Sequence, residues 1–168
     1  MTGLPTSSLQ PTSLQHFLAE QYTAELQAFR SMLDSVPAEA FAAAGLGHSP
    51  AWHALHIAEW VRLTVLQDRT PNYHHLGWED KPWVGPMGTE AAPLNEQADK
   101  TAILAQLDSV GAEAAAYLAA ASDAEMQGMT FSPSAPTGER PRLAALGLHV
   151  RHIAYHRGQV ALSRKEQE

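Results

Sequence analysis

Four long segments of this 168-residue chain carry apolar residues at helical spacing, and this pattern limits the possible folds most strongly. Apolar residues that recur every three or four positions form one face of an amphipathic helix. Ser49 followed by Pro50 is a typical helix start. No segment alternates apolar and polar residues with a period of two, so we expect no β-strands. The sequence therefore predicts an all-α four-helix bundle, with helices over residues 12–36, 50–68, 95–122 and, starting at 140–142, up to 165.

The rest of the chain divides into a lead-in and two long connections. Residues 1–11 are rich in Ser, Thr and Pro, so we expect a flexible N-terminal lead-in before a single domain over residues 12–168. The connections at 69–93 and 123–139 are longer than most loops in a compact domain, which is typical of functional segments. All four tryptophans lie on the second predicted helix and the first connection. That connection either plugs one end of the bundle with its aromatic residues or forms a lid over a substrate.

Composition and charge exclude several kinds of function. The chain has no cysteine, which excludes disulfide scaffolds, thiolate metal sites and cysteine nucleophiles. Its 18 acidic and 11 basic residues give a net charge of −7, whereas nucleic-acid binding needs clustered positive charge. No apolar run reaches the roughly 18–20 residues that span a bilayer, and the first residues lack the pattern of a secretory signal. We expect a cytoplasmic protein that binds neither nucleic acid nor membrane.

The second predicted helix carries polar residues on its apolar face. With about 100° of rotation per residue, His56 lies in the middle of the apolar stripe, about 40° from Trp60. Glu59 lies about 60° to one side of His56, and His53 about 60° to the other. A buried imidazole or carboxylate without a partner costs about 1–3 kcal/mol, and more when it is charged. We therefore expect partners for these groups elsewhere in the fold.

The last predicted helix supplies candidate partners. His152 and His156 are four residues apart, so their side chains leave one face of the helix on adjacent turns and can bind one metal ion together. His149 lies along the same edge of the apolar stripe. With His56 from the second helix, the pair would form a three-histidine site in the bundle interior. Zinc sites of this kind keep one position open for water or substrate, as catalytic sites do.

The same histidines also have a purely structural interpretation. In that case His152 and His156 are half-exposed residues at the edge of the core, and His56 is a core residue bonded to a backbone or tyrosine oxygen. His53 and His149 lie one turn before the candidate ligands, where we expect wall residues or groups that hydrogen-bond to the ligands. The other histidines are expected at surface or loop positions, at residues 16, 48, 74 and 75.

Three further residues are candidates for the surroundings of the site. Glu59 is either a general base, or a carboxylate that orients a ligand imidazole, or the ion-pair partner of an arginine. Gln159 either donates a hydrogen bond into the site or makes a packing contact. Trp60 is expected to line the pocket beside the histidines.

Signatures of other metalloenzymes and nucleotide-binding proteins are absent. Ile153 follows His152 where the glutamate of an HExxH zinc peptidase would stand. No glutamate has a histidine three residues later, which excludes the di-iron carboxylate bundle. The nucleophile elbow, the P-loop and the dinucleotide-binding glycine motif are also missing. A mononuclear all-histidine site in a helical bundle is the chemistry that remains.

These motifs resemble those of the DinB-like superfamily, and in particular its YfiT-type metal-dependent hydrolases. The likeness is carried by WHALHIAE at residues 52–59 and HVRHIAYHRGQ at residues 149–159, and it extends over nearly the whole chain in the number and order of helices. It implies an up-down-down-up bundle with a long crossover between the second and third helices. It further implies a homodimer and one divalent metal ion per chain, zinc or nickel, bound by His56, His152 and His156.

The resemblance leaves the reaction open. Some relatives are thiol-dependent S-transferases or isomerases that use bacillithiol, mycothiol or glutathione, and many have no assigned substrate. The absence of cysteine fits a low-molecular-weight thiol co-substrate as well as hydrolysis by water. We therefore expect a metal-dependent enzyme that acts on a small molecule, with a slight preference for thiol transfer. The alternatives are a stress-related bundle that binds a metal or small ligand without turnover, and a metal-free interaction domain.

Overall fold

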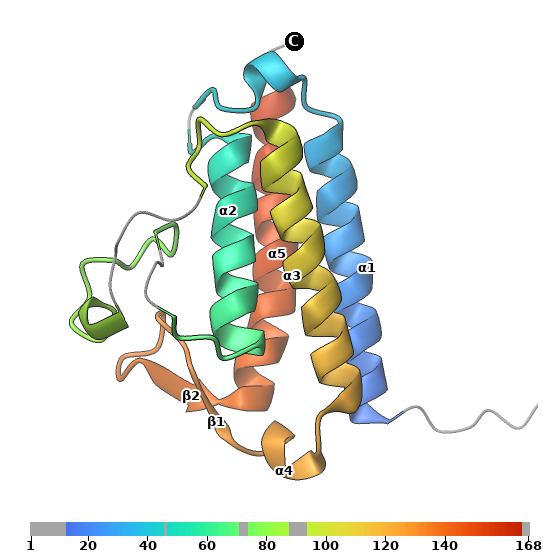
Figure 1. Cartoon of the computed structure of the whole chain (residues 1–168), viewed down its shortest axis with the longest axis vertical. Coiled ribbons are helices and arrows are strands. Elements are labelled where there is room, and N and C mark those ends of the chain that lie inside the picture. Colours follow the sequence, from blue (N-terminus) through green and yellow to red (C-terminus); the bar gives the residue numbers. More distant parts are fainter. Residues whose placement is uncertain (1–12, 46, 71–73, 88–93, 166–168) are drawn as a thin grey trace, which may run out of the picture.

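The structure is a computed structural model that describes residues 13–45, 47–70, 74–87 and 94–165. Its long helices stand side by side, and Figure 1 shows that the first and last run in one direction while the two between them run in the other. This confirms the all-α bundle and its up-down-down-up order. The predicted lead-in at residues 1–11 lies outside the described residues. The helices of the bundle are α1 (Leu14–Asp34), α2 (Pro50–Trp60), α3 (Lys100–Ala120) and α5 (Arg142–Lys165).

The arrangement of the bundle brings α2 against α5. Both α1 and α2 contact α3 and α5, so α1 and α2 lie on opposite corners of the bundle. Because α2 and α5 run in opposite directions, residues near position 56 come beside residues near position 152. The fold therefore joins two motifs that are far apart in the sequence.

Side-chain caps define where the helices begin. Ser49 accepts a hydrogen bond from the backbone N–H of Trp52, as predicted for a helix that starts at Pro50. Ser13 and Asp99 cap α1 and α3 in the same way. Such caps satisfy N–H groups that have no partner within the first turn of a helix. The third helix begins at Lys100, later than predicted. Before it the chain forms a turn in which the side chain of Asn95 accepts a hydrogen bond from the backbone N–H of Gln97.

The second helix ends in a wider turn than the sequence predicts. After Trp60 the chain continues as a π-helix over Val61–Val65, and Gln67 then adopts a positive φ of 55°. A π-turn shifts the backbone hydrogen bonds by one residue. The carbonyl of Thr64 accepts a hydrogen bond from the hydroxyl of Thr130 at 3.1 Å, which attaches the second long connection to the end of this helix.

The prediction that the chain has no strands was wrong. The connection before α5 contains the short helix α4 (Asp123–Met126) and an antiparallel hairpin of β1 (Met129–Phe131) and β2 (Glu139–Pro141). Strands of three residues are too short to show a period of two in the sequence. Gly138 has a φ of 77°, and a Cβ atom there would lie 3.0 Å from the ring of Trp83, so both the turn and the contact require glycine.

Two hydrophobic clusters stabilise the fold. The main one fills the bundle. The second joins the end of α2 and the hairpin to residues 76–87 of the first connection, which lies beside α2 rather than across the end of the bundle. The aromatic residues of that connection therefore cover one side of the bundle. The buried members of the second cluster are Trp60, Leu63, Leu76, Val84, Met87 and Phe131, with Trp78 and Trp83 packed against them.

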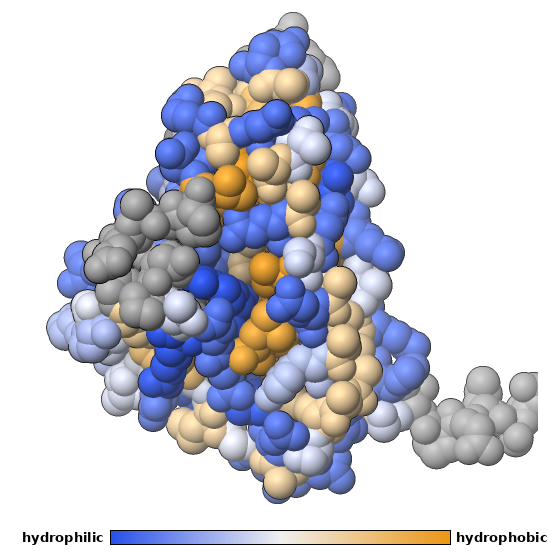
Figure 2. Space-filling view, in the orientation of Figure 1, coloured by the Kyte–Doolittle hydropathy of each residue, from blue (hydrophilic) through white to orange (hydrophobic). Residues whose placement is uncertain are grey.

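The surface is mixed in character. Figure 2 shows short hydrophobic patches separated by hydrophilic residues on the face in view. No helix among the described residues is long and apolar enough to cross a membrane.

Candidate metal centre

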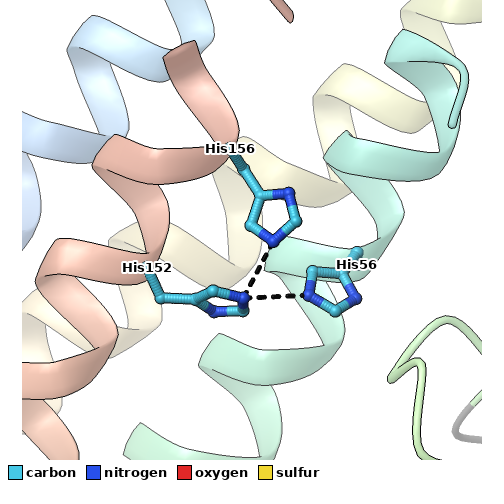
Figure 3. Close-up of side chains that lie close together, drawn as sticks. All are labelled: His56, His152 and His156. Atoms are coloured by element: carbon cyan, nitrogen blue, oxygen red, sulfur yellow. Dashed lines mark hydrogen bonds between the residues drawn. The ribbon is translucent and has the colours of Figure 1, made fainter. Parts of the chain in front are cut away.

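Three histidines from α2 and α5 point toward one another. His56, His152 and His156 each offer a ring nitrogen, and these three nitrogens lie within 4.8 Å of one another. The Nε2 atom of His152 is 3.2 Å from that of His56 and 2.8 Å from that of His156 (Figure 3). His56 and His156 are buried, and His152 is half-buried. The structure thus brings together the three residues selected from the helical spacing.

The geometry and chemistry of this cluster fit one divalent cation. Ligand nitrogens about 2.0–2.1 Å from a tetrahedral zinc ion lie about 3.3 Å apart, close to the two distances between Nε2 atoms. A neutral imidazole carries one N–H, so three facing nitrogens cannot all be satisfied by one another. A cation at their centre would accept all three lone pairs. The cluster could therefore hold a metal ion.

A backbone carbonyl orients His56. Its Nδ1 atom hydrogen-bonds to the carbonyl oxygen of His75, which lies in the first long connection. Because a carbonyl only accepts, Nδ1 carries the proton and Nε2 keeps its lone pair toward the other two histidines. A hydrogen bond to the far nitrogen of a ligand histidine fixes its tautomer in many metal sites.

His75 itself differs from the expectation. It lies in a loop, but it is only 6% exposed rather than on the surface. Its contribution comes from the backbone, and no side-chain pattern in the sequence could reveal it.

His53 supports His156 in a similar way. The Nδ1 atoms of these two rings are 2.8 Å apart, so one of them carries the proton that they share in a hydrogen bond. When His156 is the donor, its Nε2 atom is free to bind a cation. His53 is 2% exposed, and burial lowers its pKa to about 4. The structure therefore places His53 directly behind a candidate ligand.

Burial keeps the histidines of the centre uncharged. It lowers the pKa of His152 to about 4, and burial together with the nearby His152 lowers the pKa of His156 to about 2. The pKa of His56 is also well below its usual value, first because of burial and then because of the other two rings. At neutral pH all three are therefore neutral imidazoles, the form that binds metal ions.

Tryptophan rings hold the histidines in place. Trp52 stacks on His56 with ring centroids 4.4 Å apart and an angle of 18° between the planes. His48, which is exposed as expected, also stacks on Trp52, with ring centroids 3.6 Å apart. Trp60 packs its ring 4.9 Å from that of His152 and donates its Nε1–H to the carbonyl of Leu76. The rings thus leave little freedom for rotation of the histidines.

His149 lies beside the centre but has a different partner. Its Nδ1 atom is 3.2 Å from the hydroxyl of Tyr22, which is also 3.2 Å from the carbonyl of Leu146. Burial lowers the pKa of His149 well below its usual value, so the ring is neutral. Its ring stacks near that of Trp60. His149 and Trp60 therefore pack against each other and against His152.

Glu59 makes its contact away from the three ring nitrogens, whereas the side chain of Gln159 lies close enough to His156 to raise the pKa of that ring. Glu59 is 2% exposed and forms an ion pair with Arg62 at 2.6 Å, while burial raises the pKa of its carboxyl group. This ion pair is the structural alternative considered for Glu59. Gln159 donates its Nε2–H to the hydroxyl of Tyr155 at 3.0 Å. A catalytic role of Glu59 and a pocket role of Gln159 stay predictions.

A cavity of about 500 Å³ adjoins the centre on one side. His152 is both a member of the three-histidine cluster and part of the cavity wall, so a molecule in this cavity would lie next to the cluster. The cavity lies between α5, the hairpin and the first connection. We call it the His152 cavity; its walls are formed by Trp60, Trp78, Ser132, Ser134, Ala145, Leu148, His149, Arg151, His152 and Tyr155.

A four-helix bundle in which two antiparallel helices bring three histidines together is compatible with a metal-binding protein. The sequence profile of the DinB superfamily matches residues 21–160, from α1 to α5. The chain belongs to the DinB superfamily. No curated protein matches the chain.

Proposed function

We propose that the protein is a metal-dependent enzyme whose His56, His152 and His156 hold one divalent cation, zinc or nickel. The observation that carries this proposal is the convergence of three neutral imidazoles, with Nε2 atoms 2.8 and 3.2 Å apart. The hydrogen bond from His56 to the carbonyl of His75 supports it, because it directs the lone pair of Nε2 into the cluster.

A divalent cation bound by three neutral imidazoles supplies a Lewis acid that lowers the pKa of a water molecule or of a thiol co-substrate. The protein's own residues would prepare the site for this chemistry. His53 and the carbonyl of His75 hold the tautomers of His156 and His56. Trp52 and Trp60 limit access of bulk water and fix the rings. The His152 cavity offers space for an electrophilic substrate beside the nucleophile.

The reaction we propose is transfer of a low-molecular-weight thiol to a small electrophile, or hydrolysis of that electrophile by water. The slight preference for thiol transfer comes from the likeness to DinB-like relatives. The chain offers no cysteine of its own, so a thiol must come from a co-substrate.

Metal binding is the first test. Protein purified without an affinity tag should contain or take up about one equivalent of zinc or nickel per chain in a competition titration with a chromophoric chelator. His152→Ala should abolish this binding. His16→Ala is the matched control, because His16 is exposed on α1, and it should bind like the wild type. Equal affinity of all three proteins would contradict the proposed centre.

Activity is the second test. Metal-loaded protein would be incubated with monochlorobimane and bacillithiol, mycothiol or glutathione, and separately with generic esters and amides. Turnover that His152→Ala lacks supports the enzyme. Stoichiometric metal binding without turnover in any assay would favour the non-catalytic metal-binding bundle instead.

The same family likeness leads us to propose a homodimer, and the sequence expectation of no secretory signal leads us to propose that it is cytoplasmic. Large apolar side chains are exposed on α1 and α5, including Phe17 at 49% and Leu162 at 64%, and burial of such residues stabilises a subunit interface. Sedimentation velocity of the full chain would measure its mass in solution, and a monomer at all concentrations would contradict the dimer.

A further inference from the structure

The lining of the His152 cavity combines aromatic residues with one charged residue, Arg151. Four of its residues lie at 148, 151, 152 and 155, so one face of α5 supplies Leu148, Arg151, His152 and Tyr155 to the same cavity. Trp60 comes from α2, and Trp78 comes from the first connection. The loop of the hairpin adds two residues with hydroxyl groups, Ser132 and Ser134.

The charges around the cavity are not balanced. Arg151 is a permanent cation, and no aspartate or glutamate is among the residues that line the cavity. A guanidinium without a carboxylate in the same lining favours an anionic ligand.

The apolar walls restrict the rest of the ligand. Trp60, Trp78 and Tyr155 line the cavity, and planar groups pack well against aromatic side chains. A carboxylate matches both the charge and the planar, two-oxygen geometry of a guanidinium.

We propose that the His152 cavity binds a small planar organic acid, with the carboxylate on Arg151 and the planar group against Trp60, Trp78 and Tyr155. The hydroxyl groups of Ser132 and Ser134 also line the cavity and can donate to polar atoms of the ligand. As the substrate class of the enzyme this rests on the proposed function, because only His152 connects the cavity to the metal centre. As a binding site it does not depend on a metal.

The test compares phenylacetate with phenylacetamide, which has the same shape without the charge. Isothermal titration calorimetry of the full-length protein would measure both, in the metal-free and in the zinc-loaded form. A hydrogen bond to a charged group contributes about 1.5–3 kcal/mol, so wild-type protein should bind the acid at least about tenfold more tightly than the amide. The preference should be present in the metal-free form. That form is the decisive one, because in the zinc-loaded form a carboxylate could also bind the metal directly.

Two variants of α5 locate the charge that matters. Arg151→Gln should remove the preference for the acid and leave the affinity for the amide unchanged. Lys165→Gln makes the same change of charge about 21 Å further along the same helix, at 1.5 Å per residue, and should keep the preference. Circular dichroism would verify that both variants are folded.

Several results would overturn the proposal. These are equal binding of acid and amide by the wild type, a preference that survives Arg151→Gln, and a loss of preference in Lys165→Gln. Binding of neither compound at millimolar concentration would overturn it too. Failure of the proposed function is a separate result, since a protein that binds no metal but still selects phenylacetate through Arg151 keeps the binding site and loses the metalloenzyme.

Discussion

The interior between α1 and α3 is filled by apolar side chains, whereas the interior between α2 and α5 contains many polar ones. Between α1 and α3 the buried residues are apolar, and Gly111 allows an approach so close that an added Cβ would lie 3.2 Å from Leu26. Charged groups remain at the surface there, as in the ion pair of Arg30 with Asp108. Between α2 and α5 the interior contains five imidazoles, those of His53, His56, His149, His152 and His156.

The difference shows where the fold gains stability and where it gives some up. Burial of apolar surface contributes about 25 cal/mol per Å², whereas buried polar groups cost free energy unless they find partners. The histidine half recovers part of that cost through hydrogen bonds such as those to His75 and Tyr22. The apolar half therefore supplies stability that the histidine half gives up, and four predictions test this division.

Acid should have the largest effect, and it should act on the histidine half. The unfolded chain binds protons at its histidines near pH 6.5, whereas His53 and His152 in the folded protein do so only near pH 4. The unfolded state therefore binds more protons between these values, and stability present above about pH 6.5 is lost as the pH falls. At pH 5 the loss is roughly 2 kcal/mol for each of these two residues.

Urea unfolding of metal-free protein at pH 7.5, 6 and 5 would measure this loss. His56, His149 and His156 also have lowered pKa values and add to this loss. A free energy of unfolding that stays constant over this range would show that the imidazoles are not buried in the neutral form.

A cavity in the apolar half should cost nearly as much. Phe29 is fully buried in the main cluster, and Phe29→Ala should lower the free energy of unfolding by about 3–5 kcal/mol. The metal affinity of the folded variant should stay at the wild-type value, because Phe29 is not part of the centre. Chemical denaturation and a chelator titration of the same sample would measure both, and a large loss of metal affinity would contradict the division.

Replacement of a candidate ligand should lower the metal affinity strongly and the stability only modestly. Loss of a residue that hydrogen-bonds to a metal ligand typically costs 10–100-fold in metal affinity. Loss of a ligand itself should cost more, so we expect His56→Ala to lower the metal affinity by more than about 100-fold, or about 2.7 kcal/mol. The metal-free variant should lose less stability than Phe29→Ala, because it removes a polar group from the interior. Zinc titration and urea unfolding would check this, with His16→Ala as the control. Unchanged zinc affinity would exclude His56 as a ligand.

The surface ion pair of the apolar half should matter least. The side chain of Asp108 is 54% exposed and accepts two hydrogen bonds of 3.1 Å from Arg30. Such exposed pairs contribute up to about 1 kcal/mol, so Asp108→Asn should lower the free energy of unfolding by no more than that. Thermal denaturation at low and high salt would measure it, and a larger loss would mean that charges also stabilise the apolar half.

The helices and the meeting of three histidines could be predicted because both follow from the period of an α-helix. His152 and His156 share a face at a spacing of four residues, and His56 lies on the apolar stripe of its own helix. Two polar stripes directed at the interior of one bundle meet when their helices are neighbours, and the up-down-down-up order makes α2 and α5 antiparallel neighbours. Periodicity therefore contained the information needed for this part of the site.

Other contacts could not be predicted because they depend on backbone atoms or on very short elements. The carbonyl of His75 orients His56, but every residue has a carbonyl, so nothing in the sequence marks this one. The hairpin strands have three residues each, and the π-turn at Val61–Val65 follows an ordinary helical sequence. The hydroxyl of Thr130 in the hairpin donates to the carbonyl of Thr64 in the π-turn, a contact between segments that are far apart in the sequence.

The hydrogen bond between His56 and His75 has a further consequence for the protein as a thermodynamic system. Because it joins a ring of the candidate metal centre to residues 74–87, docking of that segment on the bundle and the capture of a cation are linked equilibria. Each must strengthen the other by the same factor. Occupancy of the centre would therefore be readable from outside, as slower amide hydrogen exchange and slower proteolysis in a peptide segment that contributes no metal ligand of its own.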